Sequence, residues 1–248
     1  IHAAQSATEF YEMQRRHGQT PIGWMDDIGV LTDRSIIGHG IFMDHHPWLH
    51  WTSRDDLGRM AENGATIAHC PTVFVRRGIA LNTFGEYGRR GINLGIGTDT
   101  YPHNYLDEMR TALYTARAVG GSVADLKTTD VFNAATVGGA RALRRDDIGR
   151  LAVGARADIV MSDLKHPAMM PVREPLRSLI YVAGDRAIRE VFVDGDHVVR
   201  AGQIQTIDLA AASQALEDAQ QRSMAKVPSR DWAGRDTDTL APMVLPVE

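Results

Sequence analysis

Short apolar runs that end in a polar residue recur along the first hundred residues of the chain. The clearest is residues 92–96, an apolar, β-prone run that continues through a Gly-Thr pair to Asp99. A strand buried on both faces of a parallel sheet has this nearly continuous apolar pattern. The polar residues that end the four predicted strands are His2, His39, His69 and Asp99.

The spacing of these strand ends matches a repeating unit of one strand and one helix. His39 and His69 are 30 residues apart, and so are His69 and Asp99, which is about the length of one βα unit. In a βα barrel, polar residues at the carboxyl ends of the strands form the active site. We therefore predict that the four side chains converge at one mouth of a barrel. The predicted helices cover residues 3–17, 54–62, 84–90, 107–119 and 128–143, and residues 71–81 are predicted to form a long loop.

The pattern changes near Ile148, where short alternating runs replace the βα repeat. Asp194-Gly195 has the signature of a hairpin turn between two of these runs. A helix rich in Ala and Gln is predicted over residues 209–224, and an irregular tail is predicted from Val227. The alternating runs that predict a small β module cover residues 178–182, 189–193 and 197–201.

Composition narrows the class of protein. The chain has 248 residues, of which 44% are hydrophobic, which is enough for one large domain with a real core. A formal net charge of −4 argues against a nucleic-acid partner, and no apolar run approaches the ~20 residues of a membrane-spanning helix. The single cysteine, Cys70, excludes an internal disulfide and suits a reducing compartment, so a cytoplasmic location is expected.

Four motifs at the strand ends and one later segment together resemble the amidohydrolase superfamily, in particular its cytosine/guanine deaminase and triazine hydrolase branch. The resemblance covers roughly residues 1–203, and the motifs occur in the family's order and with consistent spacing. The segments that carry it are His2-Ala3-Ala4-Gln5, Ile37-Gly38-His39-Gly40, Ala68-His69-Cys70-Pro71, Gly97-Thr98-Asp99 and residues 148–158.

The resemblance implies an α/β fold, a distorted (β/α)8 TIM-type barrel with a small β-sandwich domain. A complete barrel needs about 250 residues, so this chain is expected to hold its second half. The family's first metal-binding pair is a His-x-His, which occurs nowhere in this sequence. The pair is therefore expected on an N-terminal half of the barrel that is not in this chain. The expected divisions are residues 1–147 for the half-barrel, 148–203 for the β-sandwich segment and 204–248 for a C-terminal helix and tail.

The resemblance also implies a divalent metal at the barrel mouth, Zn first, with Fe, Mn or Co as alternatives. His2, His39 and Asp99 are the ligands that it implies in this chain. Asp99 would also accept the proton of the attacking water, and His39 would polarise the water or the substrate. The expected reaction is hydrolysis of a C–N bond in a small molecule by metal-activated water.

Gln5 is the departure from the family, whose deaminases have Glu at this position. A glutamine side chain can donate and accept hydrogen bonds, but it cannot take up and release a proton as a glutamate can. The sequence therefore favours an amide, urea or carbamate as the substrate. A ring aminohydrolase or dehalogenating hydrolase of a purine, pyrimidine or triazine is the alternative. A non-catalytic fragment or subunit that completes a partner chain is the third interpretation, and a homo-oligomer is expected.

The remaining candidate residues lie in loops that follow the strand ends. His69 either lines the pocket and supports Asp99 or is a hydrogen-bonded core histidine. The loop after His39 is rich in histidine and tryptophan, which suits a flat or apolar substrate but equally a loop packed on its neighbours. Arg76 and Arg77 either bind an anionic group or pair with surface carboxylates. The residues predicted to bind the substrate are His69, Trp48, His50, Tyr101 and His103.

Overall fold

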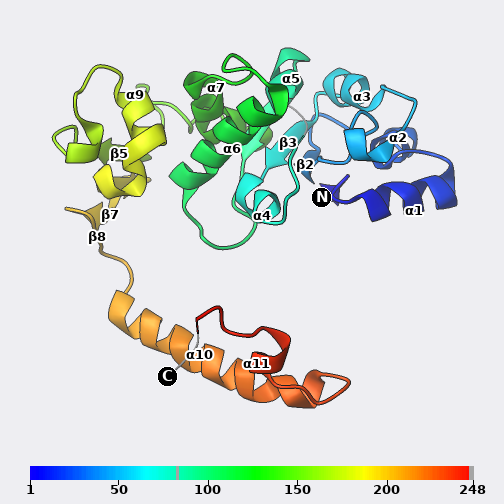
Figure 1. Ribbon diagram of the computed structural model, residues 1–248. Helices are drawn as coiled ribbons and strands as arrows, with labels where there is room; N and C mark the ends of the chain where they lie inside the picture. The colour runs from blue at the N-terminus through cyan, green and yellow to red at the C-terminus, as the bar shows by residue number, and fades with distance from the viewer. Residues whose placement is uncertain (82–83, 246–248) are drawn as a thin grey trace.

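The computed structural model describes residues 1–81 and 84–245, and its larger part is built on a four-stranded parallel sheet (Figure 1). The strands follow one another across the sheet in chain order, as successive right-handed βα units would place them. This order confirms the predicted βα repeat. The strands are β1 (His2–Ala3), β2 (Ile36–His39), β3 (Thr66–His69) and β4 (Asn93–Ile96).

The register of the sheet places the carboxyl ends of the strands at the same end of the sheet. Ala3 pairs with His39 across β1 and β2, and His69 pairs with Ile96 across β3 and β4. Because all four strands are parallel, their carboxyl ends face the same side. The predicted strand ends at His39 and His69 are confirmed by these bounds.

Helices between and after the strands pack their apolar faces on the sheet. The first of them is defined by its ends: Ser6 caps the N-terminus, and Gly18 ends it at a φ of 68°, in the left-handed region that favours glycine. Phe10 of this helix, with Ile37 and Ile67 of the sheet, is fully buried in the main core. The helices are α1 (Ala7–His17), α2 (Pro21–Asp27), α3 (Asp56–Glu62), α4 (Pro71–Val75), α5 (Phe84–Arg89), α6 (Tyr105–Gly120), α7 (Thr128–Asn133) and α8 (Gly139–Ala142).

The structure differs from the predictions in three places. The helix expected over residues 3–17 begins only at Ala7, because Ala3 belongs to β1 and Ser6 caps the helix. The expected long loop begins with helix α4, because Pro71 occupies the first helical turn, where a missing N–H costs nothing. The expected single helix over residues 128–143 is interrupted by a π-helical turn, Ala134–Gly138. Gly138 lies so close to the sheet that a Cβ atom there would be 2.0 Å from the Leu94 carbonyl oxygen. The turn therefore lets the backbone contact β4.

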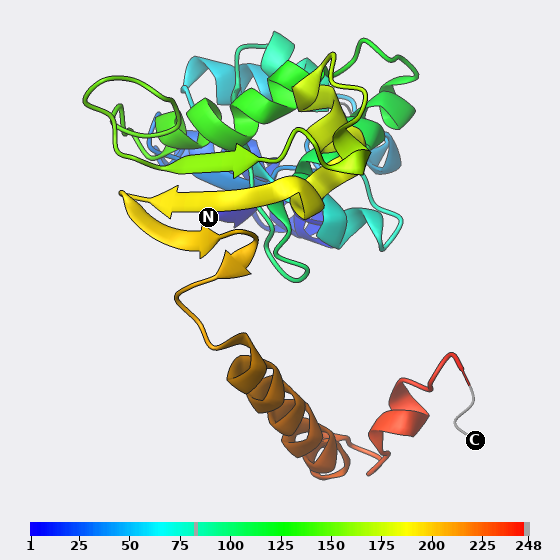
Figure 2. The ribbon, with the colours of Figure 1, turned by 90° about the vertical axis from the view of Figure 1, so that its left-hand side faces the viewer.

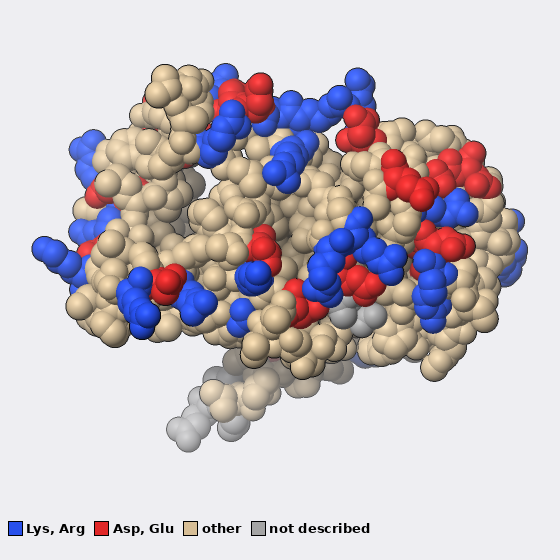
Figure 3. All heavy atoms as spheres, turned by 90° about the horizontal axis from the view of Figure 1, so that it is seen from above, with Lys and Arg blue, Asp and Glu red and all other residues tan. Residues whose placement is uncertain are grey.

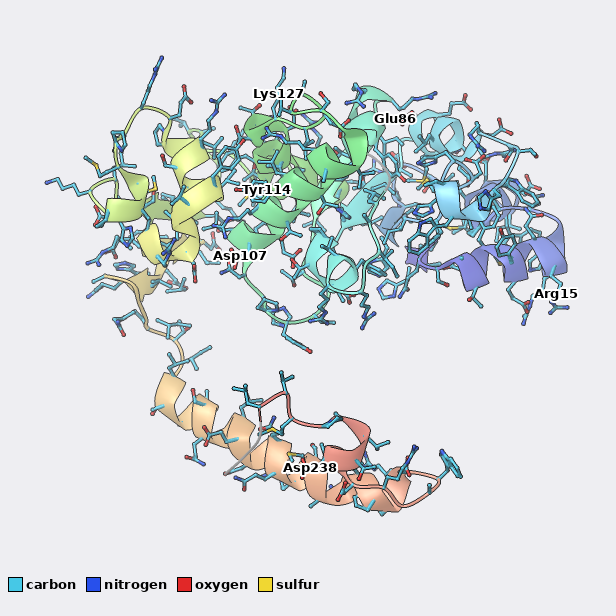
Figure 4. All side chains as sticks on the ribbon, viewed as in Figure 1. Arg15, Glu86, Asp107, Tyr114, Lys127 and Asp238 are labelled. Carbon is cyan, nitrogen blue, oxygen red and sulfur yellow. The ribbon has the colours of Figure 1, made fainter. Side chains whose placement is uncertain are left out.

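The β module is a separate four-stranded antiparallel sheet, and its hairpin at Asp194-Gly195 is confirmed. The predicted strand at residues 178–182 was wrong, because Leu179–Ala183 is a π-helical turn. That turn is held by α6, since Arg110 Nε donates to the Ile180 carbonyl at 2.7 Å. Asp107 and Tyr114, labelled in Figure 4, lie on the same helix α6. The strands are β5 (Ile159–Ser162), β6 (Ile188–Val193), β7 (Asp196–Arg200) and β8 (Gln203–Ile204), and the short helix α9 (Pro175–Ser178) lies between the first two.

The C-terminal segment stands apart from the rest of the molecule in both ribbon views (Figures 1 and 2). Its helix α10 (Leu209–Arg230) runs past the predicted end and includes Pro228, and α11 (Thr237–Leu240) forms in the tail that was expected to be irregular. Within residues 1–81 and 84–245, no helix combines the length and apolar character needed to cross a membrane. Acidic and basic side chains are interspersed over the face seen in Figure 3.

Two buried aspartates close the histidine-rich loop between β2 and α3. Asp56, which is 1% exposed, accepts hydrogen bonds from the Asp44 amide at 2.9 Å and the Thr20 hydroxyl at 2.6 Å. Asp44 in turn accepts from the Ser53 hydroxyl at 2.8 Å and the Asp55 amide at 2.6 Å. Burial and then the nearby Asp44 charge raise the pKa of Asp56 to about 6. The carboxyl group therefore binds a proton more readily in the folded protein than in the unfolded chain.

This raised pKa predicts that stability falls as the pH rises from about 4 to about 6. In that window the folded state holds more protons than the unfolded state, so the free energy of unfolding decreases with pH, by up to about 3 kcal/mol. Denaturant unfolding at several pH values measures the slope. The variant Asp56→Asn should remove this decrease, whereas Asp55→Asn, at the exposed neighbouring position, should keep it. Identical slopes in the native protein and Asp56→Asn would contradict the prediction.

Candidate active site

The predicted site residues lie at or just after the carboxyl ends of the parallel strands, and two of them are in ring contact. The rings of His2 and His39 have their centroids 4.9 Å apart. Burial lowers the pKa of His39, the carboxylate of Asp99 opposes this shift, and the charge of His2 adds to it. Burial and then His39 lower the pKa of His69 to about 3. These charge effects link His39 to His2, Asp99 and His69. His39 and His69 are each 2% exposed, whereas His2 and Asp99 are exposed to solvent.

The backbone is strained where these side chains leave the sheet. His39 has a φ of 80°, Asp99 a φ of 58° and Ala4 a φ of 52°. Non-glycine residues adopt this left-handed region rarely, at a cost of ~1 kcal/mol or more each. Gly40 continues the turn after β2, where a Cβ atom would lie 2.5 Å from Ile67 Cδ1. Strain at or after the ends of three of the four parallel strands marks this end of the sheet as a candidate functional site.

Several buried ring nitrogens at this edge have no hydrogen-bond partner. They are both nitrogens of His39 and Nδ1 of His69. Buried polar atoms nearly always have partners, so such an exception needs an explanation. Imidazole nitrogen and carboxylate oxygen are ligands that suit Zn²⁺, and His2, His39 and Asp99 fit a metal in type. In the described ranges, however, no group of three or more His, Cys, Asp or Glu is gathered closely enough to hold an ion. These residues thus fit part of a metal site.

The backbone of Gln5 is positioned by Glu9, a residue that the sequence analysis did not single out. The two carboxylate oxygens of Glu9 accept hydrogen bonds from the backbone amides of Ala4, at 2.9 Å, and Gln5, at 2.8 Å. Ser6 caps the same helix by accepting from the Glu9 amide at 3.1 Å. The Ser-x-x-Glu spacing is a capping-box signal that could have identified this role.

Glu108 is a second residue that the sequence analysis missed. It is 1% exposed in the first turn of α6 and accepts a hydrogen bond from the Thr72 amide at 3.1 Å. It thereby joins α6, which follows the Asp99 loop, to α4, which follows His69. Burial, then Asp99 and Glu108, raise the pKa of the buried Cys70 thiol to about 12. The raised pKa makes this thiol a poor nucleophile.

The histidine-rich loop after β2 divides into packed and exposed side chains. His46 caps a short 3-10 turn by accepting from the Trp48 amide at 3.2 Å, and its other ring nitrogen is 3.4 Å from the Ala80 carbonyl. Trp51 packs edge-on against Phe10, with ring centroids 5.4 Å apart. Trp48, by contrast, is 56% exposed, and His50 is also exposed. His46 and Trp51 therefore serve the packing of the loop, and Trp48 and His50 are the ones open to a ligand.

The loop after β4 carries the other two predicted pocket residues. Tyr101 is 70% exposed. His103 is also exposed, and its Nδ1 lies 3.1 Å from the Thr98 hydroxyl. The Tyr105 hydroxyl donates to the Ile96 carbonyl at 2.8 Å, which fixes the far end of the loop to the strand. Both predicted residues thus follow Asp99 on a loop that is anchored at its two ends.

Comparison with known proteins places these features in a family. The Amidohydrolase family profile matches residues 1–198. A 5-methylthioadenosine/S-adenosylhomocysteine deaminase of Pyrococcus abyssi is 31% identical over 212 residues, which are 84% of this chain and 48% of that protein. A 5'-deoxyadenosine deaminase of Methanothermobacter thermautotrophicus is 30% identical over 212 residues, which are 84% of this chain and 47% of that protein. The chain thus spans about half the length of the curated relatives it matches.

Solved structures agree with this relationship. An adenosine deaminase from Xanthomonas campestris with bound zinc is 29% identical, with a TM-score of 0.80 over 89% of this chain and 49% of that one. Atrazine chlorohydrolase from Arthrobacter aurescens, complexed with zinc, has a TM-score of 0.76 over 88% of this chain and 47% of that one. At 24% identity it shows the fold alone. The α/β fold is confirmed, closure into a barrel stays a prediction, and the chain belongs to the amidohydrolase family.

Proposed function

We propose that this chain is part of a metal-dependent hydrolase that cleaves the exocyclic C–N bond of a purine-type ring amine. The observation that carries the proposal is the placement of His2 and Asp99 near His39 at the carboxyl ends of the parallel strands, with both nitrogens of His39 unpartnered. The names of the relatives, which are deaminases of adenine-containing compounds, support a ring amine as the substrate. They favour the alternative that the sequence analysis had placed second.

Each of the proposed site residues has a distinct role in the reaction. A bound metal would supply Lewis acidity and a water molecule of lowered pKa. Asp99 accepts the proton of the attacking water, and His39 donates a hydrogen bond to the oxygen as charge develops. His69, whose buried Nδ1 is also without a partner, lines the pocket near His39. Gln5 donates a hydrogen bond to a ring nitrogen without transferring a proton, so the proton for the leaving amine comes from Asp99.

The exposed aromatic and imidazole groups are proposed to bind the flat ring. Trp48 and His50 rise from the loop after β2, and Tyr101 and His103 from the loop after β4. These loops follow strand ends of the same sheet, and aromatic faces suit a heteroaromatic ring.

An N-terminal half of the barrel that carries the family's His-x-His pair is proposed to complete the site. In the described part of the chain, β1 and β4 are the outer strands of the parallel sheet, and parallel sheets are ordinarily closed or covered at such edges. The incomplete ligand set at the strand ends supports the same proposal.

Hydrolysis of an amide, urea or carbamate is the second candidate function. The specific observation in its favour is Gln5, whose side chain cannot exchange the proton that ring deamination requires. Carbonyl addition would need only the proton acceptor and the oxyanion donor that Asp99 and His39 provide.

A substrate panel separates the candidates. We expect the metal-loaded complete protein to deaminate adenosine-type ring amines, and Gln5→Glu to raise kcat/KM for them by about 10- to 100-fold, because a carboxyl group would restore a proton donor. Amides, ureas and carbamates should be unaffected or slower in that variant, because it adds charge beside the attacking oxygen. Hydrolysis of carbonyl substrates without deamination would establish the second candidate. Absence of any turnover in the metal-loaded protein would support a non-catalytic role.

A further inference from the structure

Arg76 reaches from one strand-end loop to the next. It directly follows α4, and therefore belongs to the βα unit of His69. Its guanidinium donates to the Tyr101 carbonyl and to the Thr100 hydroxyl, each at 3.3 Å. The same group lies over the Tyr101 ring, 4.6 Å from its centroid. Three contacts thus connect the end of α4 to the two residues that follow Asp99.

The contacts of Arg76 are with the two residues that directly follow Asp99, whose backbone is strained. Asp99 has a φ of 58°, a conformation that persists only when the surrounding structure holds it. The contacts of Thr98 with His103 and of Tyr105 with Ile96 lie within the same βα unit. Arg76 adds a restraint from the neighbouring unit, next to the strained residue.

We propose that Arg76 is a positioning residue, which holds Thr100 and Tyr101 and thereby fixes the Asp99 carboxylate at the mouth of the site. This inference rests on the proposed function for the role of Asp99. A planar guanidinium suits the task, because it can donate to two acceptors at once and cover an aromatic ring, which a lysine ammonium cannot do in one geometry. The proposal differs from anion binding, in which Arg76 would act on the substrate.

Arg77 is the matched control. It is the next residue, carries the same charge and is exposed, as Arg76 is. Replacing either arginine by alanine removes one positive charge at nearly the same place, so long-range electrostatic effects on the site are similar. The two variants differ in whether the contacts with Thr100 and Tyr101 are lost.

The experiment uses the complete, metal-loaded protein with Arg76→Ala, Arg76→Lys and Arg77→Ala. Hydrogen exchange of residues 98–104 and the kinetics of a ring amine are measured for each. Arg76→Ala should speed exchange in this segment and lower kcat by about ten-fold, because a displacement of about 1 Å at a reacting group costs up to ~100-fold. KM should rise by no more than about three-fold, through the loosened Tyr101. Arg76→Lys should recover part of both effects, and Arg77→Ala should resemble the native protein. A raised KM in both alanine variants, with kcat and exchange unchanged, would overturn the proposal and assign the arginines to charge recognition.

A double-mutant cycle with Thr100→Val tests the contact itself. The hydroxyl of Thr100 is one of the two acceptors of Arg76, so the effects of Thr100→Val and Arg76→Ala on loop exchange should be less than additive. Additive effects would overturn the proposal. Hydrogen exchange also tests this inference separately from the proposed function, because the measurement requires no catalytic turnover. Unchanged exchange in Arg76→Ala refutes the positioning role, whereas a loosened loop in a protein without deaminase activity supports the restraint and refutes the proposed function.

Discussion

Replacement of Asp99 by alanine should abolish most of the activity, with kcat/KM falling by about 10²- to 10⁴-fold, the usual contribution of a positioned general base. The carboxylate stands at the carboxyl end of β4, near enough to oppose the lowered pKa of His39. Among the described residues, the other carboxylates near the strand ends, Glu9 and Glu108, accept hydrogen bonds from backbone amides, and the family's Glu position holds Gln5. Steady-state kinetics and metal content, measured on the same preparation, check the expectation.

Two further variants show whether the loss of activity in Asp99→Ala comes from the missing base. Asp99→Asn keeps the shape of the side chain and removes the base, so it should be nearly as inactive as Asp99→Ala. Cys70→Ser changes a neighbouring buried thiol that has no catalytic role, and its kcat/KM should stay within about two-fold of the native value. If Asp99→Ala kept a tenth or more of the native activity, another group would have to accept the proton and the mechanism would be wrong.

Metal binding should depend on a companion segment that carries the His-x-His pair. Within the described residues, no three metal-binding side chains are gathered closely enough to hold an ion, and a catalytic zinc site ordinarily has three protein ligands. We expect the isolated 248-residue chain to retain little zinc after dialysis and to have no measurable deaminase activity. Mixed or co-expressed with the companion, it should bind zinc in a fixed ratio and gain activity.

The control for this experiment is a companion in which both histidines of the pair are replaced by alanine. It should assemble with the chain, because the sheet edges are unchanged, and should fail to restore zinc binding. Metal analysis and the masses of the assembled species distinguish these outcomes. Tight zinc binding and full activity of the isolated chain would show that its own residues complete the site.

The pattern of the chain predicts the strands, their order and the ends of β2 and β3 at His39 and His69, whereas β4 ends at Ile96, three residues before the predicted Asp99. The apolar runs before His39 and His69 gave strand bounds within one or two residues of β2 and β3, because a strand buried on both faces must be apolar along its length. The 30-residue spacing gave the parallel repeat, and the motifs at the strand ends gave the family. These features are local in the chain, or repeat along it, so a linear pattern contains them.

Which polar side chains support the site depends on contacts that form only in the folded protein. Glu108 contacts Thr72 across 36 residues, and Arg76 contacts Thr100 across 24. In the sequence these residues have the pattern of solvated helix or loop positions, because a charge pattern does not specify which distant backbone amide or hydroxyl a side chain will meet. The π-helical turn at Ala134–Gly138 has the same origin, since the close approach of Gly138 to Leu94 exists only once the helix packs on β4. Contacts between distant segments depend on how the βα units pack, and that packing fixed the surroundings of Asp99.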